Sequence, residues 1–313
     1  MNNVFRFLAV MVLCALVVQP FPLLAQDEEA QPPEEPALPE APVIPEVVPT
    51  TIPVPAAPPI ATTAGLQIVT FPSSRPGVTL RLMIGTPASP PTAVLLQFTG
   101  VAGTNPFREE GGQVRVGTSF PARTTDRYLQ QGLATALLDV PSDQPDGMSP
   151  QFRGGSAHVE DAAAVVAQLT ARWPDKPLFI VGTSNGTISA TNLGLNLNEP
   201  RVQGLILTST VGLMASTMFT VANLPVEQLR LPVLMVHHRD DTCVLSPYDA
   251  ANRVRARMTS SPKVDFVSVS GGTPLSGEPC AGVGPHVLAG RDSEIVAAIV
   301  DYVAGRPVPA QIG

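Results

Sequence analysis

A serine flanked by glycines lies where an apolar run changes into a helical pattern. The segment reads Gly182-Thr-Ser184-Asn-Gly186 and directly follows the apolar run Leu178–Val181. A serine on a turn from a strand to a helix has strained backbone angles, and flanking glycines remove Cβ atoms that would clash there. Such a turn presents the hydroxyl above the sheet, so the sequence predicts Ser184 as a nucleophile for acyl transfer. A glycine-flanked structural turn is the alternative.

An acid and a histidine follow this serine along the chain. His286 is the only histidine after residue 238, and it follows the last predicted strand. Because a hydroxyl of high pKa needs an imidazole to take its proton, we predict His286 as the general base. Asp240 and Asp241 compete as the acid, and adjacent residues at a strand end point in different directions. We predict Asp241 as the acid, with Asp240 bonded to the turn backbone. The other histidines are interpreted as packed or surface side chains: His158, His237 and His238.

Backbone N–H groups are predicted to stabilise the oxyanion of the reaction. The N–H of Asn185, directly after the serine, is the first expected donor. The segment 98–103 reads Phe-Thr-Gly-Val-Ala-Gly, and its glycines would let the backbone approach a ligand closely. Val101 is therefore the predicted second donor, although a flexible glycine turn would have the same sequence.

The cysteines indicate a covalent link between two of these loops. Cys14 lies in the N-terminal apolar run, which leaves Cys243 and Cys280 in the rest of the chain. An even pair in an oxidising compartment favours a disulfide. It would join the loop that carries Asp241 (the acid loop) to the loop that carries His286 (the histidine loop). Two free thiols are the alternative. Two cysteines and four scattered histidines give no metal-site spacing, so neither a metal nor another cofactor is predicted.

Short apolar runs alternate with amphipathic stretches from residue 65 onward, which predicts one doubly wound α/β domain. The later runs are continuously apolar, as expected of parallel strands buried on both faces. Eight strands are expected, at Leu66–Phe71, Val78–Ile84, Ala93–Phe98, Ala134–Val140, Leu178–Val181, Gly204–Thr208, Val233–His237 and Val264–Val269. The expected helices are Arg123–Gln131, Ser156–Trp173, Asn185–Leu195, Tyr248–Met258 and Arg291–Val303.

The first part of the chain has a different character. Residues 1–25 carry Arg6, an apolar run and a small residue at Ala25, which predicts a secretory signal peptide and an exported, periplasmic or secreted protein. An uncleaved signal that tethers the protein to a membrane is the alternative. Residues 26–63 contain eleven prolines and are expected to form a disordered, extended spacer before the domain at 64–313.

Charge is concentrated in that spacer. The whole chain has a net charge of −7, and seven acidic residues fall between residues 26 and 46 without a basic residue among them. From residue 47 onward, 18 basic residues face 19 acidic ones. A nucleic-acid-binding protein needs a basic face to displace phosphate counterions, so we predict no nucleic-acid partner.

These residues resemble the α/β-hydrolase superfamily, and more closely the exported α/β-hydrolase family proteins of Gram-negative bacteria. The resemblance covers about residues 66–305 and rests on Phe98–Gly103, Asp139–Asp143, Gly182–Thr187, His237–Cys243, and Pro279-Cys280 ahead of Pro285-His286. It implies the triad Ser184, Asp241 and His286, but no known substrate. The sequence departs from the family pattern at Asn185, where a basic residue is more common, and in its long proline spacer.

The expected fold is an α/β-hydrolase fold: an eight-stranded, mostly parallel sheet with helices on both faces. About 20 residues, Val211–Leu231, separate the sixth and seventh strands, too few for a large cap domain. Met214, Met218 and Phe219 in this segment could line an acyl pocket or belong to the core.

Without a large cap domain, the site is expected to be open. An open site favours an exported serine hydrolase of the carboxylesterase type (EC 3.1.1), acting on a small-molecule or polymer ester. A peptidase or amidase with the same triad, and an inactive binding module of the cell envelope, are the alternatives. The sequence leaves the oligomeric state open.

Overall fold

The computed structural model describes residues 65–104, 106–214 and 218–313. The predicted signal peptide 1–25 and spacer 26–63 lie outside the described residues. Within the described ranges, no helix combines the length and the apolar character needed to cross a membrane.

A nine-stranded sheet lies at the centre, in the order β1-β2-β6-β3-β7-β8-β9-β10-β11. Its strands are β1 Gly65–Pro72, β2 Thr79–Thr86, β3 Ala93–Phe98, β6 Leu133–Leu138, β7 Leu178–Thr183, β8 Val202–Thr208, β9 Val233–His238, β10 Val264–Val269 and β11 Gln311–Ile312. Strand β2 runs antiparallel to β1 and β6, and all other neighbours are parallel. Every residue of β3, β6, β7 and β9 is buried, as their continuous apolar sequences predict. The predicted mostly parallel α/β fold is confirmed.

The expected number of eight strands is wrong by one. All eight expected strands occur, and the ninth, β11, has only two residues, which is too short to leave a periodic pattern in the sequence. A separate hairpin, β4 Phe107–Glu110 and β5 Gln113–Val116, was also not expected. Its polar strands give a weak strand signal, and only the Gly111-Gly112 turn between them indicates a hairpin.

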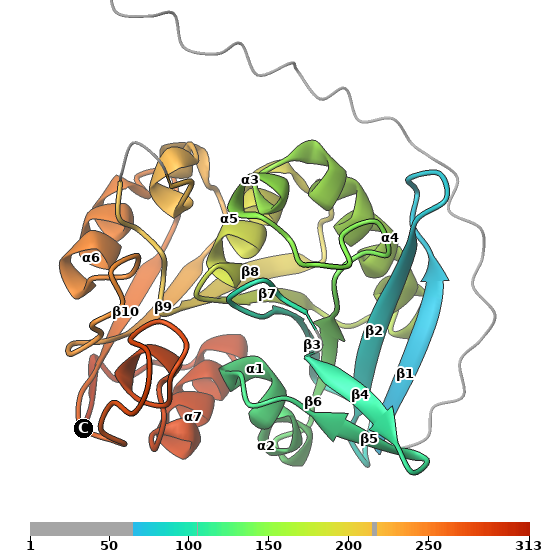
Figure 1. The fold of residues 1–313 in the computed structure, drawn as a ribbon, viewed down its shortest axis with the longest axis horizontal. Coiled ribbons are helices and arrows are strands. Elements are labelled where there is room, and N and C mark those ends of the chain that lie inside the picture. The colour runs from blue at the N-terminus through green and yellow to red at the C-terminus, as the bar shows by residue number, and fades with distance from the viewer. Residues whose placement is uncertain (1–64, 105, 215–217) are drawn as a thin grey trace, which may run out of the picture. The chain divides into compact units, whose positions relative to one another are not determined.

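Helices cover both faces of the sheet (Figure 1). They are α1 Phe120–Arg123, α2 Thr125–Gln130, α3 Pro150–Arg153, α4 Ser156–Arg172, α5 Gly186–Asn196, α6 Tyr248–Arg257 and α7 Asp292–Val303. Helices α4, α5 and α6 pack on one apolar cluster, and α1, α2 and α7 pack on the other. The five expected helices are present, whereas the four-residue helices α1 and α3 were not expected because one turn is too short to show helical periodicity.

The connection between β8 and β9 remains small. Its described residues contain two short 3₁₀ helices, η1 Val221–Asn223 and η2 Val226–Gln228, whose valines are buried in the core. The described part of the chain therefore has no large cap domain over the carboxyl ends of the strands, as predicted.

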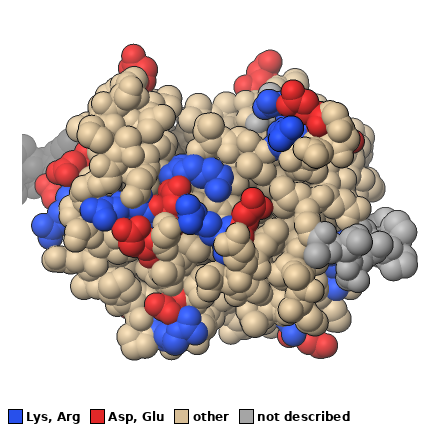
Figure 2. All heavy atoms as spheres, turned by 90° about the horizontal axis from the view of Figure 1, so that it is seen from below, with Lys and Arg blue, Asp and Glu red and all other residues tan. Residues whose placement is uncertain are grey.

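Basic and acidic side chains are intermixed on the face that is seen from below Figure 1, where α2 and α7 lie (Figure 2). Arg123 pairs with Asp292 at 2.8 Å, and Arg306 pairs with Asp301 at 2.7 Å. No patch of one sign dominates this view, in agreement with the near balance of charges after residue 47.

Candidate active site

Ser184 lies on a tight turn between β7 and α5. Its φ of 54° is in the left-handed region, which non-glycine residues rarely adopt. Several hydrogen bonds hold this conformation: the Ser184 N–H donates to the Thr208 carbonyl at 3.0 Å, and the Ser184 carbonyl accepts from the backbone and side chain of Thr187 at 2.8 and 2.6 Å. The surrounding structure thus fixes a strained serine at the carboxyl end of a central strand.

The flanking glycines are required by close backbone contacts. A Cβ at Gly182 would lie 2.3 Å from the Gly186 carbonyl oxygen, and a Cβ at Gly186 would lie 2.3 Å from the Phe98 carbonyl oxygen. A Cβ at Gly100 would lie 2.7 Å from the Cβ of Ser184. These positions exclude any side chain, and they let the loop after β3 lie against the serine turn.

The predicted base and acid form a hydrogen-bonded chain with this serine. His286 Nε2 lies 3.0 Å from Ser184 Oγ, and His286 Nδ1 lies 2.9 Å from Asp241 Oδ2. His286 belongs to the 3₁₀ helix η3, Pro285–Val287, and the side chains of His286 and Asp241 are buried. Because the carboxylate accepts the proton of Nδ1, Nε2 keeps the lone pair that can accept the serine proton.

The two adjacent aspartates lie in different environments. Asp241 Oδ1 accepts a hydrogen bond from the Cys243 N–H at 2.9 Å, whereas the Asp240 side chain is 75% exposed. The hydrogen bond to the turn backbone that we expected of Asp240 is therefore made by Asp241, and that expectation was wrong. The strand end directs Asp241 inward toward His286 and Asp240 outward to solvent.

Ser246 is a polar group at the site that the sequence analysis missed. Its Oγ lies 2.9 Å from Asp241 Oδ2 and 3.0 Å from His286 Nδ1. The hydroxyl therefore satisfies the same carboxylate oxygen that holds the histidine. No pattern in the sequence distinguishes this serine from other loop serines, since its role depends on the fold of the acid loop.

The loop after β3 reaches the serine turn through a side chain. Val101 has a φ of 47°, and its carbonyl accepts a hydrogen bond from the Asn185 Nδ2 at 3.2 Å. Within the described residues, neither the Val101 N–H nor the Asn185 N–H donates a hydrogen bond to the protein. Val101 lines the same cavity as Ser184, Asn185 follows Ser184 directly in the chain, and both N–H groups are therefore free of partners among the described residues. Asn185, where a basic residue was expected, instead links the two loops.

A cavity of about 330 Å³ opens at these residues. It is lined by Thr99–Thr104, Pro106, Gly117–Phe120, Thr183, Ser184, Cys280, His286 and Val287. His286 is the only one of these side chains that can carry a charge. Met214, Met218 and Phe219 do not line this cavity: both methionines are exposed, and Phe219 packs against the core.

Comparisons with known proteins agree with this fold. A family model described as "Serine aminopeptidase, S33" matches residues 125–224, which include Ser184. A cold-adapted esterase from an Arctic intertidal metagenomic library superposes with a TM-score of 0.52 at 15% identity, covering 77% of this chain and 93% of the other. The chain has the α/β-hydrolase fold.

Other solved structures share this fold. Est1E from Butyrivibrio proteoclasticus has a TM-score of 0.51 at 15% identity, covering 77% of this chain and 98% of the other. An alpha-beta serine hydrolase homologue from Coxiella burnetii has a TM-score of 0.52 at 19% identity, covering 77% of this chain and 99% of the other. No curated protein matches the sequence.

A buried arginine lies beneath the loop after β3 that carries Val101, which we call the oxyanion loop after its predicted role. Arg153, at the end of α3, is 0% exposed, and its Nη1 donates to Ser189 Oγ at 3.0 Å while Nη2 lies 3.5 Å from the Val101 carbonyl oxygen. No carboxylate among the described residues pairs with it, and burial lowers its pKa to about 10. The burial of Arg153 was not predicted from the sequence, because a lone arginine between predicted elements is usually exposed.

A buried histidine packs beside the sheet. His158, on α4, lies between the rings of Phe98 and Phe152, with centroids 5.4 and 5.6 Å away. Neither of its ring nitrogens has a hydrogen-bond partner among the described residues. Burial, together with the positive charges of Arg153 and Arg75, lowers the pKa of His158 to about 3. The interpretation of His158 as a packed side chain agrees with this environment.

We expect His158 to make the folding stability fall in acid. Between about pH 6.5 and pH 3 the unfolded chain binds a proton at this histidine and the folded chain does not, so the free energy of unfolding decreases as pH falls. The loss is about 1.4 kcal/mol per pH unit. Urea denaturation of wild type and His158→Leu between pH 4 and pH 8 measures it. A smaller slope in the variant is expected, and equal slopes would contradict the assignment.

A disulfide joins Cys243 of the acid loop to Cys280 of the histidine loop, 37 residues apart. Cys243 lies two residues after Asp241, and its N–H donates to that carboxylate. The link therefore limits the relative motion of the two loops that bring Asp241 and His286 together.

Removing this disulfide should lower stability by about 3–4 kcal/mol, because the unfolded chain gains loop entropy. For a domain of this size, that corresponds to a melting temperature lower by roughly 6–16 °C. Calorimetry of Cys243→Ala/Cys280→Ala against wild type, each with and without dithiothreitol, measures the effect. Dithiothreitol should destabilise wild type and leave the double variant unchanged. If the double variant without dithiothreitol is less stable than untreated wild type by under about 1 kcal/mol, the prediction is contradicted.

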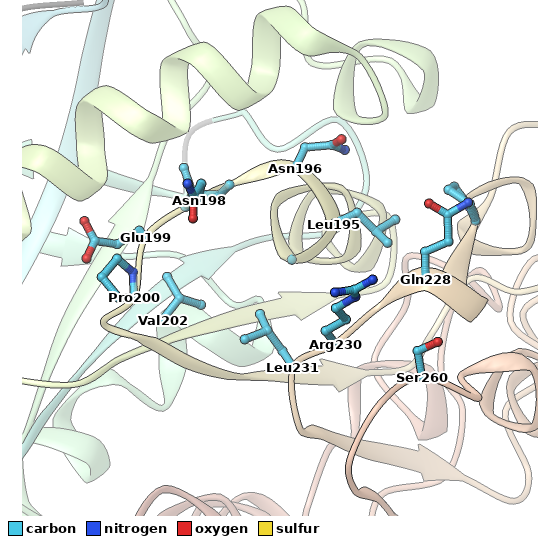
Figure 3. A pocket seen from close by; sticks show the side chains of 13 residues that line it. Leu195, Asn196, Asn198, Glu199, Pro200, Val202, Gln228, Arg230, Leu231 and Ser260 are labelled. Carbon is cyan, nitrogen blue, oxygen red and sulfur yellow. The ribbon is translucent and has the colours of Figure 1, made fainter. Parts of the chain in front are cut away.

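A larger hollow of about 760 Å³ lies away from the catalytic candidates (Figure 3). Glu199 and Pro200 precede β8, and Arg230 and Leu231 precede β9, so this hollow lies at the amino ends of the parallel strands. Ser184, Asp241 and His286 instead follow carboxyl ends, where ligands of open α/β sheets bind. Among the described residues, no cluster of three or more His, Cys, Asp or Glu side chains could hold a metal ion.

Proposed function

We propose that the chain is an exported serine hydrolase that cleaves carboxylic esters through an acyl-enzyme. The observation that carries this proposal is the chain of hydrogen bonds from Ser184 Oγ to His286 Nε2, at 3.0 Å, and from His286 Nδ1 to Asp241, at 2.9 Å. This arrangement provides a nucleophile, a base and an acid that orients the base, which is the minimum that acyl transfer requires.

The reaction then follows from the positions of the groups. Ser184 Oγ attacks the ester carbonyl carbon while His286 Nε2 takes the hydroxyl proton, and Asp241 stabilises the imidazolium that forms. The N–H groups of Asn185 and Val101 donate to the oxyanion. His286 returns its proton to the departing alcohol, which leaves an acyl-enzyme. Water, deprotonated by the same nitrogen, attacks the acyl carbon, and His286 then gives this proton to Ser184 Oγ as the acid leaves.

The pocket favours esters over peptides with a free amino terminus. An aminopeptidase has to hold a substrate ammonium group, which a carboxylate does best. The described residues of the pocket lining include no Asp or Glu, and their polar groups are hydroxyls, backbone groups and His286. The family model that matches residues 125–224 is described by an aminopeptidase, which makes peptide bonds the second candidate.

A labelling and turnover experiment tests this function. The purified protein is treated with a fluorophosphonate probe, the modified peptide is identified by mass spectrometry, and turnover of p-nitrophenyl butyrate is compared with that of butyryl p-nitroanilide and leucine p-nitroanilide. We expect the label on Ser184 and turnover of the ester at least 100-fold faster than of either anilide. Faster cleavage of leucine p-nitroanilide would support the peptidase, and absence of both labelling and turnover would support the inactive binding module.

Export is proposed from the leader-like sequence 1–25, and the disulfide supports it because such bonds persist in oxidising compartments. N-terminal sequencing of the protein from the periplasm of a bacterial host tests it. We expect a mature chain that begins at Gln26, and recovery of the intact chain in the membrane fraction would instead show a retained anchor.

A further inference from the structure

Exposed apolar side chains are concentrated around the candidate active site. Seven large apolar side chains of the described residues are well exposed, and six belong to loops that follow carboxyl ends of the parallel strands. We call these six the apolar rim: Val101, Met214, Met218, Val244, Leu275 and Val283. The seventh, Val116, is next to Gly117, which lines the pocket. All other large apolar side chains of the described residues are less exposed than these seven.

The loops of the rim are joined to one another and to the pocket. The N–H groups of Gly212 and Leu213 donate to the Leu245 carbonyl at 3.0 and 3.2 Å, which brings the segment with Met214 to the acid loop. The disulfide joins the acid loop, with Val244, to the histidine loop, with Leu275 and Val283.

The oxyanion loop is joined to the serine turn by the Asn185–Val101 hydrogen bond. Val101 and Cys280 both line the pocket of Ser184, so the rim continues from this pocket.

Several rim side chains are as exposed as surface polar residues. Met214 is 65% exposed, Val244 66% and Val101 62%. Exposed apolar surface that gathers at one place on a soluble protein marks a contact with another apolar surface. Val101 of the rim lines the pocket that contains Ser184, so a partner bound to the rim lies next to the predicted nucleophile.

The occupant is also uncharged. Among the described residues that line the pocket, His286 is the only ionisable side chain, and none is a lysine or arginine that could hold a phosphate or carboxylate. The pocket, at about 330 Å³, is at the small end of ligand pockets and has room for a short acyl chain.

We propose that the apolar rim adsorbs to the surface of a condensed, uncharged, short-chain ester, and so brings Ser184 to substrate that is not dissolved. This inference rests on the proposed ester hydrolysis and extends it to the physical state of the substrate. The rim contacts the droplet surface, and one acyl chain enters the pocket from it. Without a cap in the described residues, adsorption requires no opening step.

Tributyrin, supplied below and above its solubility limit, tests the inference. Three enzymes are compared: wild type, a polar variant (Met214→Gln/Val244→Gln/Leu275→Gln) and an apolar control (Met214→Leu/Val244→Ile/Leu275→Met). Wild type and the apolar control should show a rise of at least fivefold in rate above the solubility limit. The polar variant should lose this rise, and should hydrolyse dissolved p-nitrophenyl acetate within twofold of wild type.

Adsorption is measured independently of catalysis, with Ser184→Ala in the three backgrounds. Tributyrin droplets should deplete the wild-type and apolar forms from solution at least tenfold more than the polar form. Equal depletion of all three, or binding to phosphatidylcholine vesicles in preference to droplets, would overturn the inference. A wild-type dimer that the polar variant converts to a monomer would instead make the rim a self-association surface.

The two proposals fail separately in this design. Activity on p-nitrophenyl acetate without any rise on tributyrin droplets refutes the adsorption and leaves the esterase proposal intact. Depletion on droplets without hydrolysis of any ester refutes the proposed function and retains the surface contact.

Discussion

Ser184→Ala is expected to lower kcat for p-nitrophenyl butyrate by about 10⁴-fold or more, because it removes the hydroxyl that lies 3.0 Å from His286 Nε2. The backbone and the oxyanion donors remain, so a small rate above the uncatalysed reaction should persist. Stopped-flow kinetics with wild type and variant, with circular dichroism to verify folding, measures the loss. Ser260→Ala, at an exposed serine beside the hollow at the amino ends of the strands, is the control and should retain wild-type activity.

Ser184→Gly extends this prediction to stability. The φ of 54° at Ser184 is strained for any residue with a Cβ, and glycine removes the strain. The glycine variant should be as inactive as the alanine variant, yet more stable than it by about 1 kcal/mol. If the two variants unfold at the same temperature, the turn does not store strain.

Asp241→Asn is expected to lower kcat by about 10³–10⁴-fold, because the amide can hold His286 in the wrong tautomer and cannot stabilise the imidazolium. Asp241 Oδ2 accepts hydrogen bonds from His286 Nδ1 and Ser246 Oγ, both at 2.9 Å, and the carboxylate has no access to water. Kinetics on the same ester, across pH 6–9, measures the effect.

Asp240→Asn is the natural control for that experiment. The Asp240 side chain is 75% exposed and should leave kcat within about twofold of wild type, as surface substitutions usually do. A large loss in Asp240→Asn with near-normal activity in Asp241→Asn would reverse the assignment of the acid.

Chain order and strand ends were enough to predict which residues gather at the site. Ser184 follows β7, Asp241 follows β9 and His286 follows β10, and parallel strands bring their carboxyl ends to one edge. The structure places these three within hydrogen-bond distance, and their roles stay a prediction until they are tested. Asp241 could be preferred over Asp240 only through the alternation of side chains at a strand end.

The positions of side chains that depend on contacts between segments far apart in the sequence could not be predicted. Ser246 contacts the acid because the loop after β9 folds back on itself, and Arg153 is buried because α3 packs against α5. Neither position carries a local pattern, since a loop serine and a loop arginine are ordinarily at the surface. The strand β11 was missed for a related reason: two residues form it only because β10 offers an open edge.

Arg153 gives the oxyanion loop an electrostatic environment that the solvent does not control. Dissolved ions screen exposed charges over about 10 Å at 0.1 M salt, but they do not enter a protein interior. The guanidinium is fully buried and its Nη2 lies 3.5 Å from the Val101 carbonyl oxygen, so its positive field reaches the loop at any ionic strength. The loop is therefore polarised from inside the protein, and the salt concentration of the surrounding medium has little effect on that part of the site.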